Sequence, residues 1–204
     1  WSELNKTMQA QIKKKDTYKM GIDTLFNLRR QLMQTLVSFK EDLCREDFNA
    51  IPFINADGYH SKTIAYSIWH IFRIEDIVAH TVITEDEQVF FTGNYQVRIN
   101  SPIITTGNEL VKQQIADFSK QLNLEELYSY IFEVRESTEK ILERFSYDEL
   151  KWKIPDERKG YLKSLNVVNC DEKAIWLIDY WCSKDIRGLI QMPFSRHWIM
   201  HTEA

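Results

Sequence analysis

Residues 61–83 read SKTIAYSIWHIFRIEDIVAHTVI. On a helical wheel the apolar residues of this segment face nearly every direction, whereas a surface helix carries an apolar stripe on one side only. We therefore expect it to be the central and most buried helix of the protein. Ser61 is expected to be its N-cap, because a serine hydroxyl can accept a hydrogen bond from the first turn.

Three other regions of the chain have a helical pattern. Residues 18–45 and 108–145 place apolar residues at helical spacing, and Asn123 is expected to cap a break within the second of these regions. A further helix is expected to begin at Asp171 and to be interrupted before the last residues. Only six glycines and four prolines are present, which favours long helices over many short strands.

The connections between these helices differ in length. Residues 46–60 contain a turn signal at Asp57-Gly58, and residues 146–170 are expected to be irregular. Residues 84–107 form a long polar crossover after the second helix. The pattern predicts an all-α protein, a helix bundle in one domain spanning residues 1–204, with residues 1–17 as an N-terminal arm or short helix.

The composition excludes several classes of function. A net charge of −4 gives no electrostatic footprint for nucleic acid. No apolar run approaches the roughly 20 residues that cross a bilayer, so no membrane association is expected. The three cysteines are odd in number and lack CxxC spacing, which indicates free thiols in a reducing compartment. Because the N-terminus is polar and resembles no signal peptide, we expect a cytoplasmic protein.

Two of the five histidines lie four residues apart near the end of the chain. His197 and His201 would project from one helical face, a spacing at which two imidazoles can bind one metal ion. The alternative is a pair of half-exposed surface histidines stacked against neighbouring aromatic residues. His70, in the apolar helix, is the leading third ligand, although a lone core histidine needs no function. His60 and His80 are expected to be surface residues.

Two further side chains near these histidines have open roles. Glu75 falls on an apolar stripe of the second helix, and a carboxylate there needs a partner. It is expected to form a buried ion pair with Arg73 or Arg30, or else to orient a ligand histidine. Cys182 has no histidine beside it in the sequence, so a reactive thiol there has no support.

Two segments resemble one protein family. Ser67-Ile-Trp-His-Ile-Phe-Arg-Ile-Glu-Asp76 is similar to the second-helix segment of the DinB-like (YfiT-like) superfamily of four-helix metalloproteins. Met192-Pro-Phe-Ser-Arg-His-Trp-Ile-Met-His201 is similar to the C-terminal segment of that family. The resemblance implies an antiparallel four-helix bundle with up-down-down-up topology. It also implies a divalent metal ion, zinc or nickel, bound by a triad of histidines at the positions His70, His197 and His201.

The resemblance also implies a class of activity and an assembly. Family members with known activity use low-molecular-weight thiols in transfer or isomerisation reactions, and others are described as metal-dependent hydrolases by analogy. Many are homodimers. We therefore expect an enzyme that transfers a thiol to a small electrophile, with metal-dependent hydrolysis as the first alternative. The second alternative is a non-catalytic bundle, which a fourth protein ligand such as Glu75 or Cys182 would favour, because structural zinc sites have four ligands.

Overall fold

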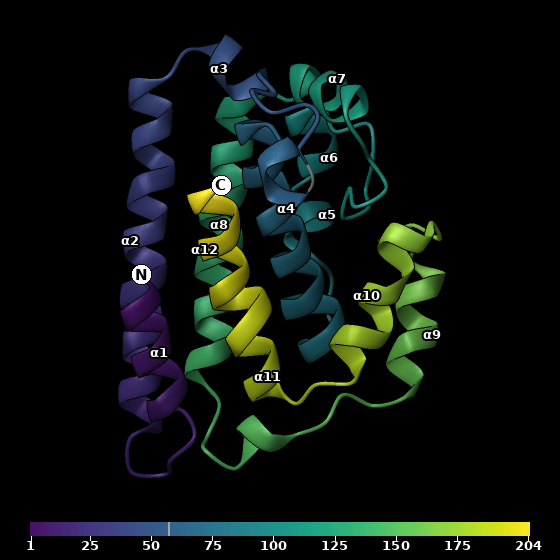
Figure 1. The fold of residues 1–204 in the computed structure, drawn as a ribbon. Helices are drawn as coiled ribbons and strands as arrows, with labels where there is room; N and C mark the ends of the chain where they lie inside the picture. Colours follow the sequence, from purple (N-terminus) through teal and green to yellow (C-terminus); the bar gives the residue numbers. More distant parts are fainter. Residues whose placement is uncertain (57) are drawn as a thin grey trace.

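The computed structural model describes residues 1–56 and 58–204, and most of these residues fold into helices (Figure 1). No strand forms among them, apart from an isolated bridge between Lys153 and Asp185. The all-α class predicted from the sequence is therefore confirmed. The turn expected at Asp57-Gly58 falls partly on Asp57, which lies outside the described residues.

The helices follow one another along the chain in a simple order. Their bounds are α1 (Ser2–Gln11), α2 (Tyr18–Asp42), α3 (Arg45–Asn49), α4 (Ile64–Asp76), α5 (Val89–Thr92), α6 (Tyr95–Ile99), α7 (Gln113–Gln121), α8 (Leu124–Glu143), α9 (Glu157–Ser164), α10 (Glu172–Cys182), α11 (Ile186–Gln191) and α12 (His197–Glu203). Short 3-10 helices cover Gly58–Ser61 and Glu149–Lys151. The π-helical segment Ile77–Thr84 extends α4, and a second one, Met192–Arg196, leads into α12.

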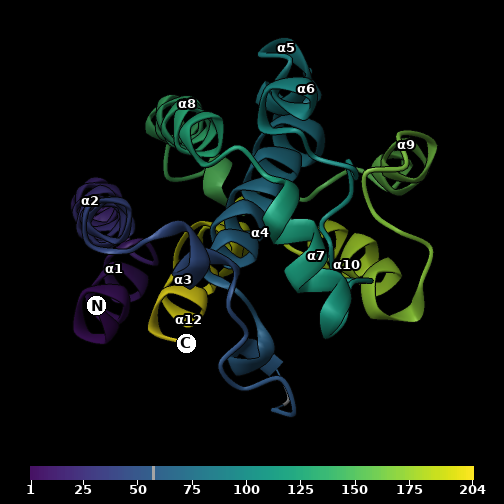
Figure 2. The same cartoon turned by 90° about the horizontal axis from the view of Figure 1, so that it is seen from above.

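Helix α4 lies in the centre of the molecule, as its apolar sequence predicted (Figure 2). The side chains of Ile68, Ile71, Phe72 and Ile74 are at most 4% exposed. Helices α8 and α12 both pack on α4, and α2 packs on α8 and α12. In Figure 1, α2 and α12 run upward while α4 and α8 run downward, so α12 brings the end of the chain back along the central helix.

Two connections contain more helix than expected. The crossover after the second helix includes α5 and α6, and the stretch expected to be irregular includes α9. Phe90 and Tyr95 anchor the crossover helices by packing their rings on Tyr130 of α8. Isolated helices this short are marginal in water. Tertiary contacts therefore stabilise them, and local sequence patterns did not reveal them.

The N-cap of α4 is Thr63 and not Ser61. The Thr63 hydroxyl accepts a hydrogen bond from the Tyr66 backbone N–H at 3.0 Å and lies 2.6 Å from the Ser119 hydroxyl of α7. Ser61 ends the preceding 3-10 turn, where its hydroxyl donates to the Gly58 carbonyl. Both residues are chemically suited to the role, but only Thr63 directly precedes the first helical residue.

We expect Thr63→Ala to lower the free energy of unfolding by about 1–2 kcal/mol, because it removes a helix cap and a buried hydrogen bond. Urea unfolding followed by circular dichroism measures this loss. Ser61→Ala is the matched control and should stay within about 0.5 kcal/mol of the wild type. Equal losses in the two variants would contradict the assignment of the cap.

Candidate metal centre

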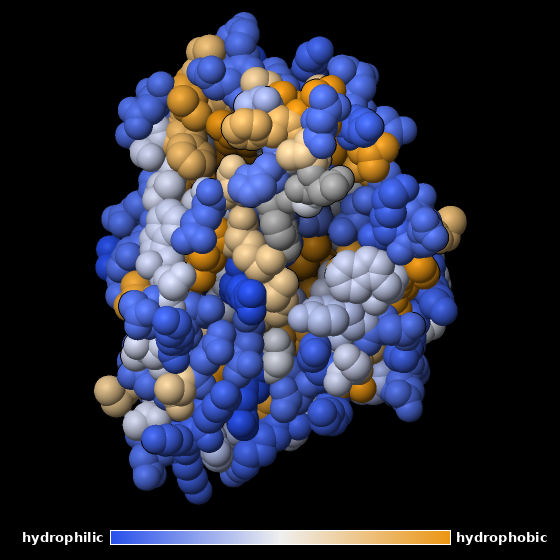
Figure 3. All heavy atoms as spheres, in the orientation of Figure 1, coloured by the Kyte–Doolittle hydropathy of each residue, from blue (hydrophilic) through white to orange (hydrophobic). Residues whose placement is uncertain are grey.

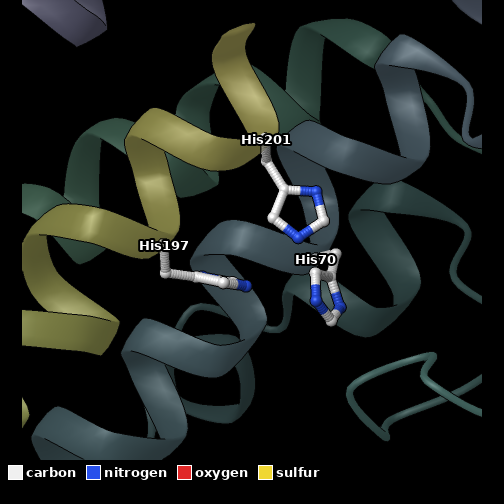
Figure 4. A group of neighbouring side chains, drawn as sticks. All are labelled: His70, His197 and His201. Carbon is white, nitrogen blue, oxygen red and sulfur yellow. The ribbon is translucent and has the colours of Figure 1, made fainter. Parts of the chain in front are cut away.

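Three histidines, one from α4 and two from α12, meet between these helices (Figure 4). His70 comes from the middle of α4, whereas His197 and His201 come from successive turns of α12. Each offers one ring nitrogen, and these three nitrogens lie within 4.8 Å of one another. All three side chains are buried, with exposed fractions of 4%, 7% and 8%. The predicted convergence is confirmed, and the alternative of half-exposed surface histidines is wrong.

The packing of α12 on α4 sets this geometry. Trp198, next to His197, packs against Phe72 with ring centroids 4.5 Å apart. The π-helical segment before α12 contains Pro193, which lacks a backbone N–H and cannot continue a regular α-helix. The wider turn there precedes the helix start at His197. Such π-turns are frequent at functional sites.

A backbone carbonyl orients the ring of His70. The Thr106 carbonyl oxygen lies 2.6 Å from His70 Nδ1, so this nitrogen donates its hydrogen to the carbonyl. The other ring nitrogen, Nε2, then keeps its lone pair for a ligand. Tyr66 stacks on the same ring, with centroids 5.3 Å apart and planes 11° from parallel. Neither partner was predicted from the sequence, although the i, i+4 spacing of Tyr66 and His70 was a signal.

Burial keeps the three imidazoles neutral. It lowers the pKa of His70 to about 4, against the smaller opposing effect of the Thr106 carbonyl. The pKa values of His197 and His201 are also lowered well below the usual range, first by burial and then by the other histidines. Histidine binds metal ions as the neutral imidazole. The cluster is therefore in its metal-binding form at neutral pH.

The donor set fits a divalent metal ion. It consists of three imidazole nitrogens and includes no carboxylate or thiol from the described residues. His197 Nδ1 is buried and forms no hydrogen bond within the described part of the chain. A buried polar atom without a partner costs about 1–3 kcal/mol. Zinc and nickel both accept imidazole ligands, and three protein ligands leave a coordination position for a substrate.

The cluster opens on a cavity of about 440 Å³. All three histidines lie in its wall, and α10 closes the opposite side with Trp176, Tyr180 and other residues. A hollow floored by hydrophobic residues lies between α12 and α10 on the face drawn in Figure 3. A second cavity of about 450 Å³ adjoins His201 from the side of α2 and α3.

Glu75 forms a buried ion pair, but its partner is Arg29 of α2. Arg29 donates two hydrogen bonds to the Glu75 carboxylate, at 2.7 and 2.9 Å, and both side chains are fully buried. Trp198 Nε1–H donates a third, at 2.8 Å. The expected partners are wrong, because Arg73 pairs with Asp76 at 3.3 Å and the exposed Arg30 bonds only within α2. No bond from Glu75 to a ligand histidine is present among the described contacts.

His80 is buried, which corrects the expectation of a surface position. Its Nδ1 donates to the Asp86 carboxylate at 2.7 Å, and its Nε2 lies 3.0 Å from the Ser137 hydroxyl. The order of these bonds is that of a Ser-His-Asp triad, but neither of the two cavities described above reaches Ser137. His60 is exposed, as expected.

Cys182 does not take part in the histidine cluster. Its side chain is buried, and burial raises the pKa of its thiol, which disfavours the reactive thiolate. Neither Glu75 nor Cys182 therefore supplies a fourth ligand in this arrangement.

No protein-family model and no curated protein matches this chain. Among the described residues, every helix is too short or too polar to cross a bilayer.

The lowered pKa of His70 predicts a pH-dependent stability of the metal-free protein. An unfolded histidine takes up a proton near pH 6.5, whereas folded His70 stays neutral down to about pH 4. The contribution of His70 to the free energy of unfolding is therefore complete above pH 6.5. It falls by about 3 kcal/mol as the pH drops from 6.5 to 4.

Urea unfolding in the presence of a chelator, at several pH values in this window, measures the effect. His70→Leu serves as the comparison, since leucine fills a similar volume with an apolar side chain that cannot titrate. We expect its stability to fall less steeply over the same window. Parallel curves for the two proteins would contradict the assigned shift.

Proposed function

We propose that this chain is a DinB-like metal-dependent enzyme with a divalent metal ion, zinc or nickel, on His70, His197 and His201. The observation that carries the proposal is the convergence of three buried, neutral imidazoles at the wall of a cavity large enough for a small substrate. The two segments that resemble the family are the ones that supply these histidines.

We also propose that the long helices form the up-down-down-up four-helix bundle of that family. Its members would be α2, α4, α8 and the α11–α12 rod. The directions of α2, α4, α8 and α12 in Figure 1 and the packing of α8 and α12 on α4 support this assignment. The remaining helices would then be additions to the bundle, with α10 forming the outer wall of the cavity.

The proposed reaction is transfer of a low-molecular-weight thiol to a small electrophile. A metal ion in an open three-histidine site supplies a positive charge that lowers the pKa of a bound thiol or water. The chain contributes neutral ligands, a ring held in place by the Thr106 carbonyl, and cavity walls that are mostly apolar. No residue of the chain is assigned as an acid or base.

The test has two stages. Elemental analysis of the purified protein and calorimetric titration with Zn²⁺ and Ni²⁺ establish metal binding. The loaded protein is then assayed for consumption of thiols such as cysteine and glutathione with a panel of alkyl and aryl halides, and in parallel for hydrolysis of esters and amides.

Metal-dependent thiol consumption supports the proposal, and metal-dependent hydrolysis alone favours the hydrolase. Metal binding without turnover in either panel favours a non-catalytic bundle, and no binding of either ion rejects the metal site. The family resemblance also leads us to propose a homodimer, which sedimentation velocity tests.

A further inference from the structure

Lys62 lies in the wall of the histidine cavity. It is the residue before the N-cap of α4, and Tyr66 and His70 follow it in the first two turns of that helix. Its Nζ lies 5.3 Å from the centroid of the Tyr66 ring, and that ring stacks on His70. Lys62 therefore shares the wall of the first cavity with the three histidines, and it also lies in the wall of the second.

This positive charge has no counterion among the described residues. Lys62 forms no ion pair there, and the wall of the histidine cavity includes no carboxylate from that part of the chain. Lys62 is partly buried, and burial lowers its pKa. A partly desolvated ammonium group without a counterion favours binding of an anion, because the anion supplies the charge interaction that burial has weakened.

The opposite wall of the cavity is aromatic. Trp176, Tyr180 and Trp181 of α10 line it, and the side chain of Trp176 remains 49% exposed. Aromatic rings bind flat apolar groups by stacking and by edge-to-face contact. A volume of about 440 Å³ is within the range of small-ligand sites, so a fused two-ring compound fits.

We propose that this cavity binds an aromatic carboxylate, with the carboxylate beside Lys62 and the ring system against the aromatic wall of α10. The proposal rests on the proposed function in so far as it names the substrate class of the same site. Asn108 adds a polar group to the cavity wall, since its buried side-chain oxygen has no partner in the described structure. A hydroxyl or amide N–H on the ligand would satisfy that oxygen.

The experiment compares two probes of the same shape. Calorimetry measures the affinity of 2-naphthoate, which carries the carboxylate, and of 2-naphthamide, which is uncharged. Each is titrated into the wild type and into Lys62→Met, Lys62→Arg and Trp176→Ala. Lys14→Met is the matched control, because Lys14 is exposed in the loop after α1 and far from Lys62 in the sequence. Every titration is made with metal-loaded and with chelator-treated protein.

We expect the wild type to bind naphthoate more tightly than naphthamide. Lys62→Met should weaken naphthoate about tenfold or more and leave naphthamide unchanged, because a hydrogen bond to a charged group contributes about 1.5–3 kcal/mol. Lys62→Arg should retain most of the affinity. Trp176→Ala should weaken both probes several-fold, and Lys14→Met should weaken neither.

Three results would overturn the proposal: equal affinity for the two probes, equal naphthoate affinity in wild type and Lys62→Met, or no binding of naphthoate. The chelated arm separates this inference from the proposed function. Lysine-dependent naphthoate binding in a protein that takes up no metal supports the anion site and rejects the metal enzyme. Metal uptake without naphthoate binding does the reverse.

Discussion

Glu75→Gln should destabilise the protein by about 3–5 kcal/mol, the loss expected when one member of a buried ion pair is removed. Glu75 accepts hydrogen bonds from Arg29 and from Trp198, and its side chain is fully buried. Glutamine keeps the shape but removes the charge, so the buried guanidinium loses its main counterion. Because the network joins α2, α4 and α12, the loss should loosen the contact that positions α12.

Chemical unfolding of the metal-free protein measures this loss. Two control variants provide smaller losses of stability for comparison. Glu139→Gln removes the second, partly exposed partner of Arg29, 3.2 Å away, and should cost less. Glu125→Gln removes an exposed pair with Lys40 and should cost at most about 1 kcal/mol. If Glu75→Gln unfolds with the same midpoint as Glu125→Gln, the network does not hold α12 in place.

Periodicity predicted the parts of the fold that depend on burial. The apolar residues of α4 face nearly every direction, and that helix is the buried centre. Asn123 caps α8 and Asp171 caps α10. Both caps could be predicted, because a cap depends on residues adjacent in the sequence. The short helices of the crossover were missed, since contacts with distant residues such as Tyr130 stabilise them.

The three histidines of the cluster could be named from the sequence as candidate metal ligands, but most of their surroundings could not be predicted. The i, i+4 spacing joins His197 to His201, and His70 was the leading third candidate because it is one of only five histidines and lies in the apolar helix; the family resemblance supported the same choice. Arg29 was missed as the partner of Glu75 because the two lie 46 positions apart and no local pattern links them. His80 was expected at the surface, because its partners Asp86 and Ser137 become its neighbours only in the folded chain.

His201→Ala should weaken binding of zinc or nickel at least about a hundredfold. It removes one of three ligands, and loss even of a group that only supports a ligand costs 10–100-fold. The metal-free protein should remain folded, because His201 lies near the end of α12 and outside the ion-pair network of Glu75. The melting temperature of the wild type should rise with added metal, since an ion that binds only the folded state stabilises it.

Calorimetric titration and metal-dependent melting at neutral pH provide the two readouts. His60→Ala is the matched control, because it removes an exposed histidine that belongs to no cluster. We expect this control to bind metal and to gain stability as the wild type does, while His201→Ala gains little. If His201→Ala binds as tightly as His60→Ala, the ion does not sit on the histidine triad. If both variants lose the metal equally although circular dichroism shows both to be folded, the assignment of His70, His197 and His201 as its ligands is wrong.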